Sequence, residues 1–419
     1  MATTSNDPAS SQDLGWGPRT LAVHAGVSAD PITGAVGPSI QTPVTFASRY
    51  GDIGFSAAGT VEDKVPFAYA REGHPNAQQL ERRLAALEGG ADAVAFASGI
   101  GAISGLLLML LNPGDHLVVS DITYAGTAEF VRGFLRQKGV EVTLVDMTDH
   151  ADVRAAITPR TKVIYAESPC NPVLKIVDIA ALAEIARAGQ AQLVIDSTFA
   201  SPALSQPLRF GADFVVHSLT KYCSGHGDAV GGAVIGRDRA QIKHLRNEIG
   251  THLGAMLSPF NAWLILRGLE TLPIRMEAYS KSALVVAQFL ESHSTVSSVR
   301  YPGLPSHPQY ELARRQMLLS SGMIAFTVRN MQDFGYALEA HLKVFLFAAS
   351  LGLSRSLILH CDTADLQRTS FQLDAEHLRR YREFAGDGFF RLSIGLEDPQ
   401  DLCRDLDGAL RASHPTRSR

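Results

Sequence analysis

Short apolar segments alternate with helical segments through the middle of the chain, and this alternation limits the possible folds more than any other feature. Segments with the composition of buried strands recur at Ala93–Ala97, His116–Ser120, Val140–Val145, Lys162–Glu167, Gln192–Ile195, Phe214–His217 and Gly231–Ile235. Helical patterns lie beside or between them at Ala77–Glu88, Thr127–Lys138, Asp149–Ala156 and Ile179–Ala188. Strands that are apolar on both faces and separated by helices form parallel sheets with helices on both sides. We therefore expect an α/β fold whose large domain has a mostly parallel sheet covered by helices.

The two ends of the chain are organised differently. A long helix is expected at Arg275–Ser292, and strands near Met323–Arg329 and Phe389–Ile394 predict a smaller α+β C-terminal domain. Residues 1–72 contain few regular patterns, and residues 1–18 have the polar composition of a disordered segment. The predicted division is an N-terminal arm over residues 1–72, a large domain over residues 73–272 and a C-terminal domain over residues 273–419.

Composition argues against several classes of protein. The chain has 419 residues, a net charge of −4 and no basic stripe, so a nucleic-acid partner is not expected. Its longest apolar run, Ile100–Leu111, is shorter than the ~18 residues that span a bilayer, and Met1–Asp13 lacks the apolar core of a signal peptide. The four cysteines have neither metal-binding nor disulfide spacing. We expect a cytoplasmic protein that acts on a small molecule without a metal ion and without a membrane partner.

Lys221 follows a predicted strand and two hydroxyl side chains. The sequence His217-Ser218-Leu219-Thr220-Lys221-Tyr222 begins where the apolar segment ends. Open α/β sheets bind ligands at the carboxyl ends of their strands. A lysine amine whose pKa is lowered by its surroundings is nucleophilic enough to form a Schiff base, and neighbouring hydroxyls can bind a phosphate. A solvated surface lysine is the alternative, which the position after a buried strand disfavours.

Asp196 ends the preceding strand in a similar way. An acid at this place can pair with a protonated pyridine nitrogen, as in sites for pyridoxal 5'-phosphate (PLP). A turn or helix N-cap aspartate is the alternative. Because Asp196 and Lys221 lie 25 residues apart and each ends a strand, we favour a shared site.

The segment Ser98-Gly99-Ile100-Gly101 joins a predicted strand to a helix. Backbone N–H groups at a helix start bind phosphate, and glycine allows the close approach. The same segment partly resembles a dinucleotide fingerprint, Gly99-x-Gly101-x-x-Ser104, with Asp121 about 20 residues further on. The third glycine of that fingerprint is missing, and a nicotinamide enzyme would leave Asp196 and Lys221 without a role. We therefore favour the phosphate of PLP.

Together these motifs resemble the PLP-dependent Cys/Met metabolism (trans-sulfuration) family over nearly the whole chain. The matching motifs are Tyr69-x-Arg71, Leu87-Glu88-Gly89, Ala97-Ser98-Gly99, Tyr124, Glu167-Ser168-Pro169-x-Asn171-Pro172, Asp196, Ser218-x-x-Lys221-Tyr222-x-Ser224-Gly225-His226 and Arg391-Leu392-Ser393-x-Gly395-Leu396-Glu397. Two further segments, Leu257–Trp263 and Tyr301–Pro308, look most like the homoserine-ester sulfhydrylase branch. The resemblance implies fold type I of the PLP-dependent transferases.

The resemblance also implies how the cofactor is held. Lys221 would bind PLP as a Schiff base and transfer protons, Asp196 would keep the pyridine nitrogen protonated, and Tyr124 would stack on the ring. These three are the predicted catalytic residues, and the phosphate would be bound by Ser98, Gly99, Ile100, Ser218 and Thr220. Tyr69 and Arg71 would reach the phosphate of a neighbouring subunit, which predicts an obligate homodimer, paired into a homotetramer.

For the substrate, the resemblance implies that Arg391 binds the α-carboxylate with help from Asn171 and Ser350, since a guanidinium fork matches a carboxylate. A surface ion pair is the alternative role for Arg391. Gly126 stands where methionine γ-lyases have a cysteine, and Ala349 where cystathionine γ-lyases have a glutamate. Neither methionine nor cystathionine is therefore favoured as the substrate.

The segment His360–Leu366 departs most from the family, which has a His-Pro-Ala-x-x-Thr/Ser-His pattern there. It contains Asp362 and Asp365 where the family has apolar and hydroxyl residues. We hypothesise that these carboxylates select a cationic γ-substituent, such as the guanidinooxy group of canavanine, because a carboxylate can pair with a guanidinium. The alternative is that both are solvated loop charges.

The predicted function is PLP-dependent γ-elimination, a carbon–heteroatom lyase reaction on a γ-substituted L-amino acid of the homoserine, methionine or canavanine type. The alternative is γ-replacement, as in an O-acetyl- or O-succinylhomoserine sulfhydrylase or a cystathionine γ-synthase-like transferase, which would use the same residues. We favour the lyase because His360–Leu366 departs from the biosynthetic pattern. A binding module without activity would have no need for Lys221, Asp196, Tyr124 and Arg391 together.

Overall fold

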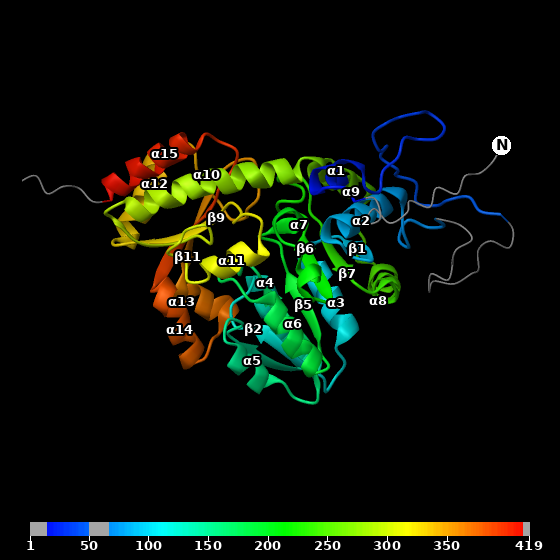
Figure 1. The fold of residues 1–419 in the computed structure, drawn as a ribbon, viewed down its shortest axis with the longest axis horizontal. Helices are drawn as coiled ribbons and strands as arrows, with labels where there is room; N and C mark the ends of the chain where they lie inside the picture. The colour runs from blue at the N-terminus through cyan, green and yellow to red at the C-terminus, as the bar shows by residue number, and fades with distance from the viewer. Residues whose placement is uncertain (1–14, 50–66, 414–419) are drawn as a thin grey trace, which may run out of the picture.

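Two sheets organise the computed structural model, which describes residues 15–49 and 67–413 (Figure 1). The larger sheet contains β1 (Asp92–Phe96), β2 (His116–Ser120), β3 (Glu141–Val145), β4 (Thr161–Glu167), β5 (Gln192–Asp196), β6 (Phe214–Ser218) and β7 (Gly232–Gly236). Its strand order is β1-β7-β6-β5-β4-β2-β3. Only β7 is antiparallel to its neighbours, β1 and β6. The expected mostly parallel sheet is thus confirmed.

Helices cover both faces of this sheet because alternate strand residues point in opposite directions. Ile195 and Val215 belong to a buried cluster with leucines of α2 (Pro75–Glu88) and α6 (Ile179–Ala188). Val194 and Val216 belong to a second cluster with α3 (Gly99–Leu110) and α8 (Arg239–Leu245). The remaining helical segments of this part are α4 (Ala125–Glu129), η1 (Phe130–Leu135), α5 (His150–Ala156), α7 (Ser201–Leu204), η2 (Pro207–Phe210), η3 (Arg246–His252) and α9 (Pro259–Glu270).

The smaller sheet has the strand order β10-β11-β12-β9-β8. The strands are β8 (Val296–Arg300), β9 (Met323–Val328), β10 (Leu346–Phe347), β11 (Leu357–Asp362) and β12 (Gly388–Ser393). On one face it packs against α10 (Leu272–Ser292), α12 (Met331–His341) and α15 (Pro399–Ala412), which lie together in Figure 1. The other helical segments of this part are α11 (Tyr310–Gln316), α13 (Thr363–Leu366), η4 (Gln367–Phe371) and α14 (Ala375–Ala385).

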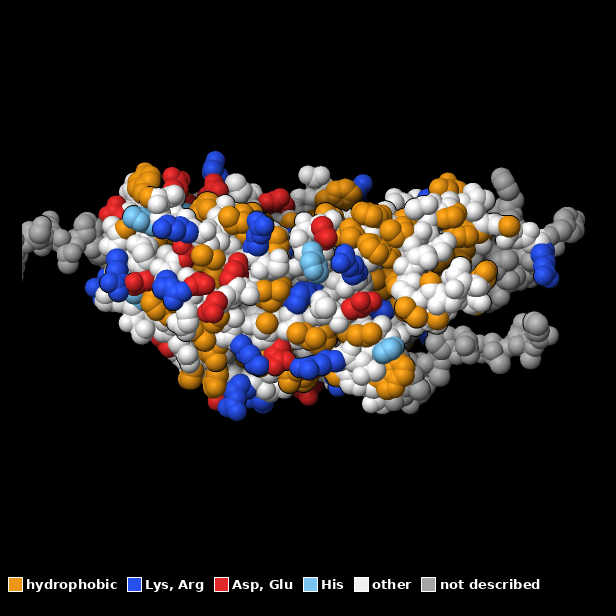
Figure 2. Space-filling model, turned by 90° about the horizontal axis from the view of Figure 1, so that it is seen from above, with side chains coloured by type: hydrophobic (Ala, Val, Ile, Leu, Met, Phe, Trp, Pro, Cys, Tyr) orange, Lys and Arg blue, Asp and Glu red, His pale blue; other side chains and the backbone are white. Residues whose placement is uncertain are grey.

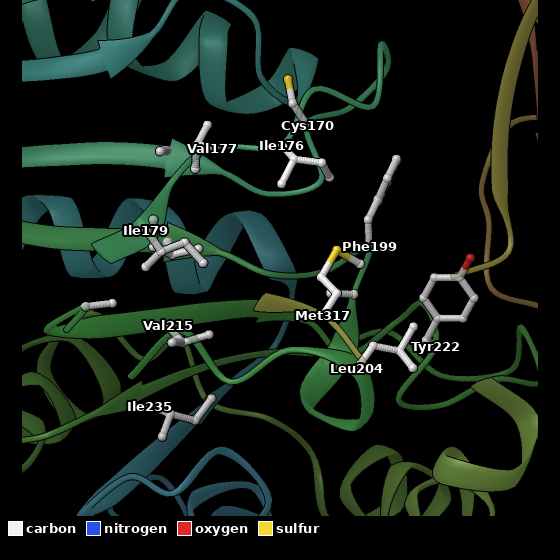
Figure 3. Packing of buried hydrophobic residues seen from close by; sticks show 14 of the residues in the cluster. Cys170, Ile176, Val177, Ile179, Phe199, Leu204, Val215, Tyr222, Ile235 and Met317 are labelled. Carbon is white, nitrogen blue, oxygen red and sulfur yellow. The ribbon is translucent and has the colours of Figure 1, made fainter. Parts of the chain in front are cut away.

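The two sheets share one core on the opposite face of the smaller sheet. Cys361 and Phe389 from this sheet belong to the same buried cluster as Ile195 and Val215. Figure 3 shows Met317, which follows α11, beside Phe199 and Leu204 of the large-sheet region. The smaller sheet is therefore held against the carboxyl-terminal side of the larger one, where the predicted site residues lie.

The N-terminal part of the chain contains a helix that the sequence did not predict. Helix α1 (Pro18–His24) begins inside the segment expected to be disordered, and residues 1–14 lie outside the described residues. The buried Arg83 guanidinium of α2 donates hydrogen bonds to the Val23 and Ala25 carbonyl oxygens at 3.0 Å each. It also donates to the Leu266 carbonyl oxygen at 3.1 Å. This tertiary contact, and not a local pattern, fixes α1 against α2 and α9.

The described helices are all too short or too polar to cross a membrane. Charged side chains of both signs are mixed over the face seen in Figure 2. Hydrophobic side chains are more frequent toward the end that carries the N-terminal segment, in which Ile32, Val36 and Val44 are exposed.

Candidate active site

The ends of β4, β5 and β6 place polar side chains on the face of the large sheet that α3 covers. Glu167 pairs in register with Asp196, and Asp196 with Val216. Tyr165 and Ser218 lie on this face as well, because each is two residues from one of these positions on its own strand. His217 points to the other face, where its Nε2 lies 2.5 Å from Glu88 Oε1. Strand alternation thus separates a buried structural pair from the site.

Asp196 is held by two hydrogen bonds in a buried position. The Tyr165 hydroxyl donates to Oδ2 at 3.3 Å, and the Thr198 backbone N–H donates to Oδ1 at 2.9 Å. Burial raises the pKa of Asp196 above its usual value. A buried carboxylate that accepts only two hydrogen bonds can accept another from a protonated ring nitrogen, and the positive charge of a pyridinium would stabilise the ionised carboxylate. Tyr165 was not among the predicted residues. Its position two residues before Glu167 on the same strand could have indicated that its side chain lies on the same face as the site.

The start of α3 forms a close contact with the end of β6. A Cβ on Gly99 would lie 2.8 Å from Ser218 Oγ, and one on Gly232 would lie 2.2 Å from the Ser98 carbonyl oxygen. Only glycine leaves this space open. The first N–H groups of a helix have no partner within the helix, so this turn can bind an anion. The predicted Gly99, Ile100 and Ser218 are thereby brought together at a place that fits a phosphate.

Two of the predicted phosphate ligands have hydrogen bonds within the protein. The Ser98 hydroxyl oxygen accepts from the Gly101 backbone N–H at 3.1 Å and so caps α3. The Thr220 hydroxyl oxygen lies 3.1 Å from the Gly231 nitrogen and 3.2 Å from the Gly231 carbonyl oxygen. The Ser98 side chain therefore shapes the anion site by capping the helix.

Lys221, Ser350 and Arg391 meet although they come from distant parts of the chain. The Lys221 Nζ donates to Ser350 Oγ at 2.9 Å, and the Arg391 Nη2 donates to the Ser350 carbonyl oxygen at 3.2 Å. Arg391 Nη1 donates to Asn171 Oδ1 at 2.5 Å. Burial and the nearby Arg391 charge lower the pKa of the Lys221 amine. Arg391 is itself buried, which excludes the surface ion pair considered as its alternative role.

Tyr124 stands at the start of α4 with 45% of its surface exposed. Its backbone N–H donates to Glu167 Oε2 at 2.8 Å, and the Thr123 hydroxyl donates to the same oxygen at 2.8 Å. A Cβ on Gly126 would lie 2.7 Å from Cε1 of the Tyr124 ring. The absence of a side chain at Gly126 therefore lets the ring keep its position.

Tyr69 and Arg71 lie at a β-bridge and the turn that follows it in the N-terminal part. Tyr69 pairs with Thr45 and is exposed, and Arg71 stacks over its ring at 5.5 Å from the centroid. Arg71 Nη1 also donates to the Thr251 carbonyl oxygen at 2.8 Å. The contact with a neighbouring subunit remains a prediction for both residues.

Asp362 and Asp365 have local partners and do not join the other site residues. Asp362 pairs in register with Gly388 and thus points to the opposite face of the small sheet from Arg391, which pairs with Leu359. Its Oδ1 caps α13 by accepting from the Asp365 backbone N–H at 2.7 Å. Asp365 is exposed and forms an ion pair with Arg368. Neither residue lies in a loop, because Asp362 ends β11 and Asp365 belongs to α13. Their selection of a cationic γ-substituent stays a prediction that no contact in the described residues supports.

Among residues 15–49 and 67–413, no group of three or more histidine, cysteine or acidic side chains is arranged to hold a metal ion. The structure also has a separate surface cavity of about 550 Å³, lined by Lys175, Arg300 and Tyr381 among others, which includes none of the predicted site residues. The constellation around Lys221 fits PLP, because a glycine-lined helix start, a buried acid and a half-buried amine occur at one end of one sheet.

Comparison with known proteins agrees with this constellation. The model of the family described as "Cys/Met metabolism PLP-dependent enzyme" matches residues 19–411. Cystathionine gamma-synthase from Mycobacterium tuberculosis is 44% identical over 94% of this chain and 97% of its own length. Canavanine gamma-lyase from Pseudomonas canavaninivorans is 42% identical over 93% of this chain and 95% of its own length. The crystal structure of metB from Corynebacterium glutamicum superposes with a TM-score of 0.86 at 36% identity, covering 96% of this chain and 99% of that one.

Proposed function

The chain belongs to the Cys/Met metabolism PLP-dependent enzyme family, and from this premise we propose that it catalyses γ-elimination on a γ-substituted L-amino acid. The substrate would be of the homoserine, methionine or canavanine type. Water enters overall, and the products are a 2-oxo acid, ammonia and the protonated γ-substituent. The observation that carries the proposal is the contact of Lys221 with Ser350, because it places a proton-accepting amine next to the guanidinium of Arg391.

The cofactor would lie between α3 and the ends of β4 to β6. Its phosphate would bind the Gly99 and Ile100 N–H groups together with Ser218 and Thr220, and Asp196 would pair with its ring nitrogen. When bound, PLP withdraws electrons from the substrate Cα, which makes the Cα proton removable. Tyr124 would cover the ring from the exposed side.

Arg391 would bind the substrate α-carboxylate through its guanidinium fork. Asn171 and the Ser350 carbonyl oxygen fix the orientation of this fork. The Lys221 amine would accept the Cα proton, because its lowered pKa increases the fraction in the basic, uncharged form. Departure of the γ-substituent also requires removal of a Cβ proton, whose bonding electrons form the Cβ–Cγ double bond as the substituent leaves. We assign this second deprotonation to the Lys221 amine, once it has passed on the Cα proton. The leaving atom gains a proton, and the Tyr124 hydroxyl is the group that we assign to this transfer.

The alternative is γ-replacement, in which a thiol or sulfide takes the place of the leaving group. The similarity to the cystathionine gamma-synthase of M. tuberculosis favours it. The similarity to the canavanine gamma-lyase of P. canavaninivorans favours elimination. We retain elimination because the segment His360–Leu366 departs from the biosynthetic pattern. Replacement would use the same Lys221, Tyr124 and Arg391.

We also propose that the enzyme is a homodimer, paired into a homotetramer. Tyr69 is exposed although it is a large aromatic side chain, and exposed hydrophobic residues precede it in the N-terminal segment. Large exposed apolar areas mark interaction surfaces. A second copy of the chain on this surface would bring Tyr69 and Arg71 to the other subunit's phosphate site.

A product screen tests the proposed function. The holoenzyme is incubated with O-acetylhomoserine, O-succinylhomoserine, methionine, homocysteine and canavanine, each with and without sulfide or cysteine, and 2-oxo acid and ammonia are measured. Elimination predicts both products from at least one amino acid without an added thiol. Turnover that requires an ester together with sulfide or cysteine would overturn the elimination proposal and favour replacement.

A further inference from the structure

Glu167 carries three hydrogen bonds that connect two parts of the site. Its Oε2 accepts from the Thr123 hydroxyl and the Tyr124 backbone N–H, both at 2.8 Å. Its Oε1 accepts from the Asn171 backbone N–H at 3.0 Å. Tyr124 lies on the ring side of the proposed cofactor site, and Asn171 orients Arg391 on the carboxylate side. One carboxylate therefore holds the backbone of both sides.

A role in folding alone does not account for this carboxylate. The Glu167 side chain is buried, its hydrogen-bond donors are neutral, and no described lysine, arginine or histidine forms an ion pair with it. It is also the register neighbour of the buried Asp196. Ionising a buried acid that has no ion-pair partner, next to a second acid, is unfavourable, and its hydrogen bonds offset only part of that cost. Such a cost is typical of residues retained for a functional site.

We propose that Glu167 is a positioning residue that couples the cofactor ring site at Tyr124 to the carboxylate-binding site at Arg391. This inference rests on the proposed function, because it assumes that Tyr124 and Arg391 act in the same site. Movement of the segment that begins α4 is passed through Glu167 to the loop that contains Asn171. Amino-acid binding and ring contact are thereby linked energetically.

Only the ionised form of Glu167 can accept hydrogen bonds on both oxygens, from the Thr123 hydroxyl and Tyr124 N–H on one and from the Asn171 N–H on the other. A carboxylate has two accepting oxygens, whereas a carboxamide has one oxygen and one N–H₂ donor. A glutamine at this position would satisfy either the Tyr124 side or the Asn171 side and would present a donor to the other. Burial and the charge of Asp196 raise the pKa of Glu167 above its usual value, whereas the three hydrogen bonds that it accepts favour the ionised form and lower it. The Glu167 charge also interacts electrostatically with three other titratable side chains, those of Tyr165, Cys170 and Arg391.

The test compares Glu167→Gln and Glu167→Asp with Glu81→Gln in the holoenzyme. Glu81 is the control for loss of a buried carboxylate elsewhere, because it accepts from the Ala95 backbone N–H at 2.9 Å and does not contact the site. Unlike Glu167, it also pairs with Arg246 at 3.1 Å, so its substitution should cost at least as much stability. We expect Glu167→Gln to raise KM for the amino acid at least tenfold and to shift the visible absorbance of bound PLP. Glu167→Asp, which keeps the charge, should recover part of both effects. Glu81→Gln should lower the thermal midpoint without changing either readout.

A double-mutant cycle separates positioning from a merely structural role. If Glu167 acts through Asn171, Glu167→Gln should raise KM less than twofold when Asn171→Ala is already present. Independent, multiplicative effects of the two substitutions would overturn the proposal. So would Glu167→Gln enzyme with wild-type KM and absorbance.

The coupling through Glu167 can be measured whether or not the enzyme catalyses elimination. If the wild type performs replacement and no elimination, the same KM comparison is made with the replacement substrate. If the wild type turns over none of the substrates, L-alanine binding to the holoenzyme is measured by absorbance titration. In the first case a higher KM, and in the second a weaker binding of L-alanine, in Glu167→Gln but not in Glu81→Gln supports the coupling. An unchanged KM or L-alanine affinity in Glu167→Gln overturns it.

Discussion

The Lys221 amine nitrogen lies 2.9 Å from the hydroxyl oxygen of Ser350, a residue 129 positions away in the sequence. Ser350 has a backbone φ of 109°, in a region that L-residues other than glycine rarely adopt. Its hydroxyl oxygen accepts a hydrogen bond from Lys221, and its carbonyl oxygen accepts one from Arg391. The strained backbone allows one residue to contact the amine and the guanidinium at the same time.

Replacing Ser350 should separate strain from function. Ser350→Gly and Ser350→Ala both remove the hydroxyl, so we expect a lower kcat in both, with KM largely retained because the Arg391–carbonyl contact remains. Glycine tolerates positive φ, and we therefore expect Ser350→Gly to be more stable than Ser350→Ala by about 1 kcal/mol. Urea unfolding of the two variants measures this difference. Equal stability would show that the backbone at Ser350 is unstrained.

Gly126 should control the position of the Tyr124 ring. A Cβ at residue 126 would lie 2.7 Å from the ring, which must then move. Because Tyr124 is exposed, it can move without unfolding the protein. We expect Gly126→Ala and Gly126→Cys to lower kcat/KM at least tenfold, with the thermal midpoint changed by no more than about 2 °C.

Gly133→Ala is the matched control for the Gly126 variants, because a Cβ on Gly133 meets nothing within 4 Å. Its kcat/KM should equal that of the wild type. Wild-type activity in Gly126→Cys would mean that the ring position in the structure is not required for turnover.

His307 should make the fold sensitive to acid. Burial lowers the pKa of His307 to about 4, with the Arg300 charge as a second cause. Its Nδ1 accepts from the Gln309 backbone N–H at 3.1 Å, so protonation there would break this hydrogen bond. In the unfolded chain the pKa is about 6.5, so the unfolded state binds more protons between these values. Stability is therefore fully present above about pH 6.5 and decreases as the pH falls to about 4.

The measurement is the free energy of unfolding against pH for the wild type and His307→Asn. Linkage predicts that the wild type loses of the order of 2–3 kcal/mol more than the variant between about pH 6.5 and 4. His244→Asn, at an exposed position, serves as the control and should follow the wild type. Parallel pH curves for wild type and His307→Asn would contradict the prediction.

Subunit complementation should reveal whether Arg71 acts across an interface. We expect Lys221→Ala and Arg71→Ala each to be inactive alone. An equimolar mixture of the two variants is unfolded and refolded, so that half of the dimers contain one subunit of each. If Arg71 contributes to the site of the neighbouring subunit, one of the two sites in each mixed dimer has both Lys221 and Arg71. About a quarter of the wild-type activity should then return. No recovery in mixtures shown by mass spectrometry to contain mixed dimers would assign Arg71 to its own subunit's site.

The central sheet and its cofactor could be predicted from the sequence, because the signals are local. Strand and helix periodicity appear in neighbouring residues, and β2 and α6 have the bounds that were expected. Asp196 and Lys221 stand out in the sequence, because Asp196 ends one apolar strand and Lys221 lies three residues beyond the end of the next. Helix α1 was missed, because it is held by the guanidinium of Arg83 from another helix.

The arrangement of the substrate side depends on contacts between distant segments, and the sequence could not supply it. The position of Asp362 within a family motif suggested a place near the substrate, whereas strand pairing points its side chain to the opposite face of the small sheet from Arg391. Glu167 was visible only as part of a motif, and its three hydrogen bonds become apparent only when β4 ends beside α4 and the Asn171 loop. The sequence by itself thus determined the family, the sheet and the cofactor, since these follow from short-range patterns. The tertiary structure decided which side chains share the site, because packing of the two sheets sets the direction of each side chain.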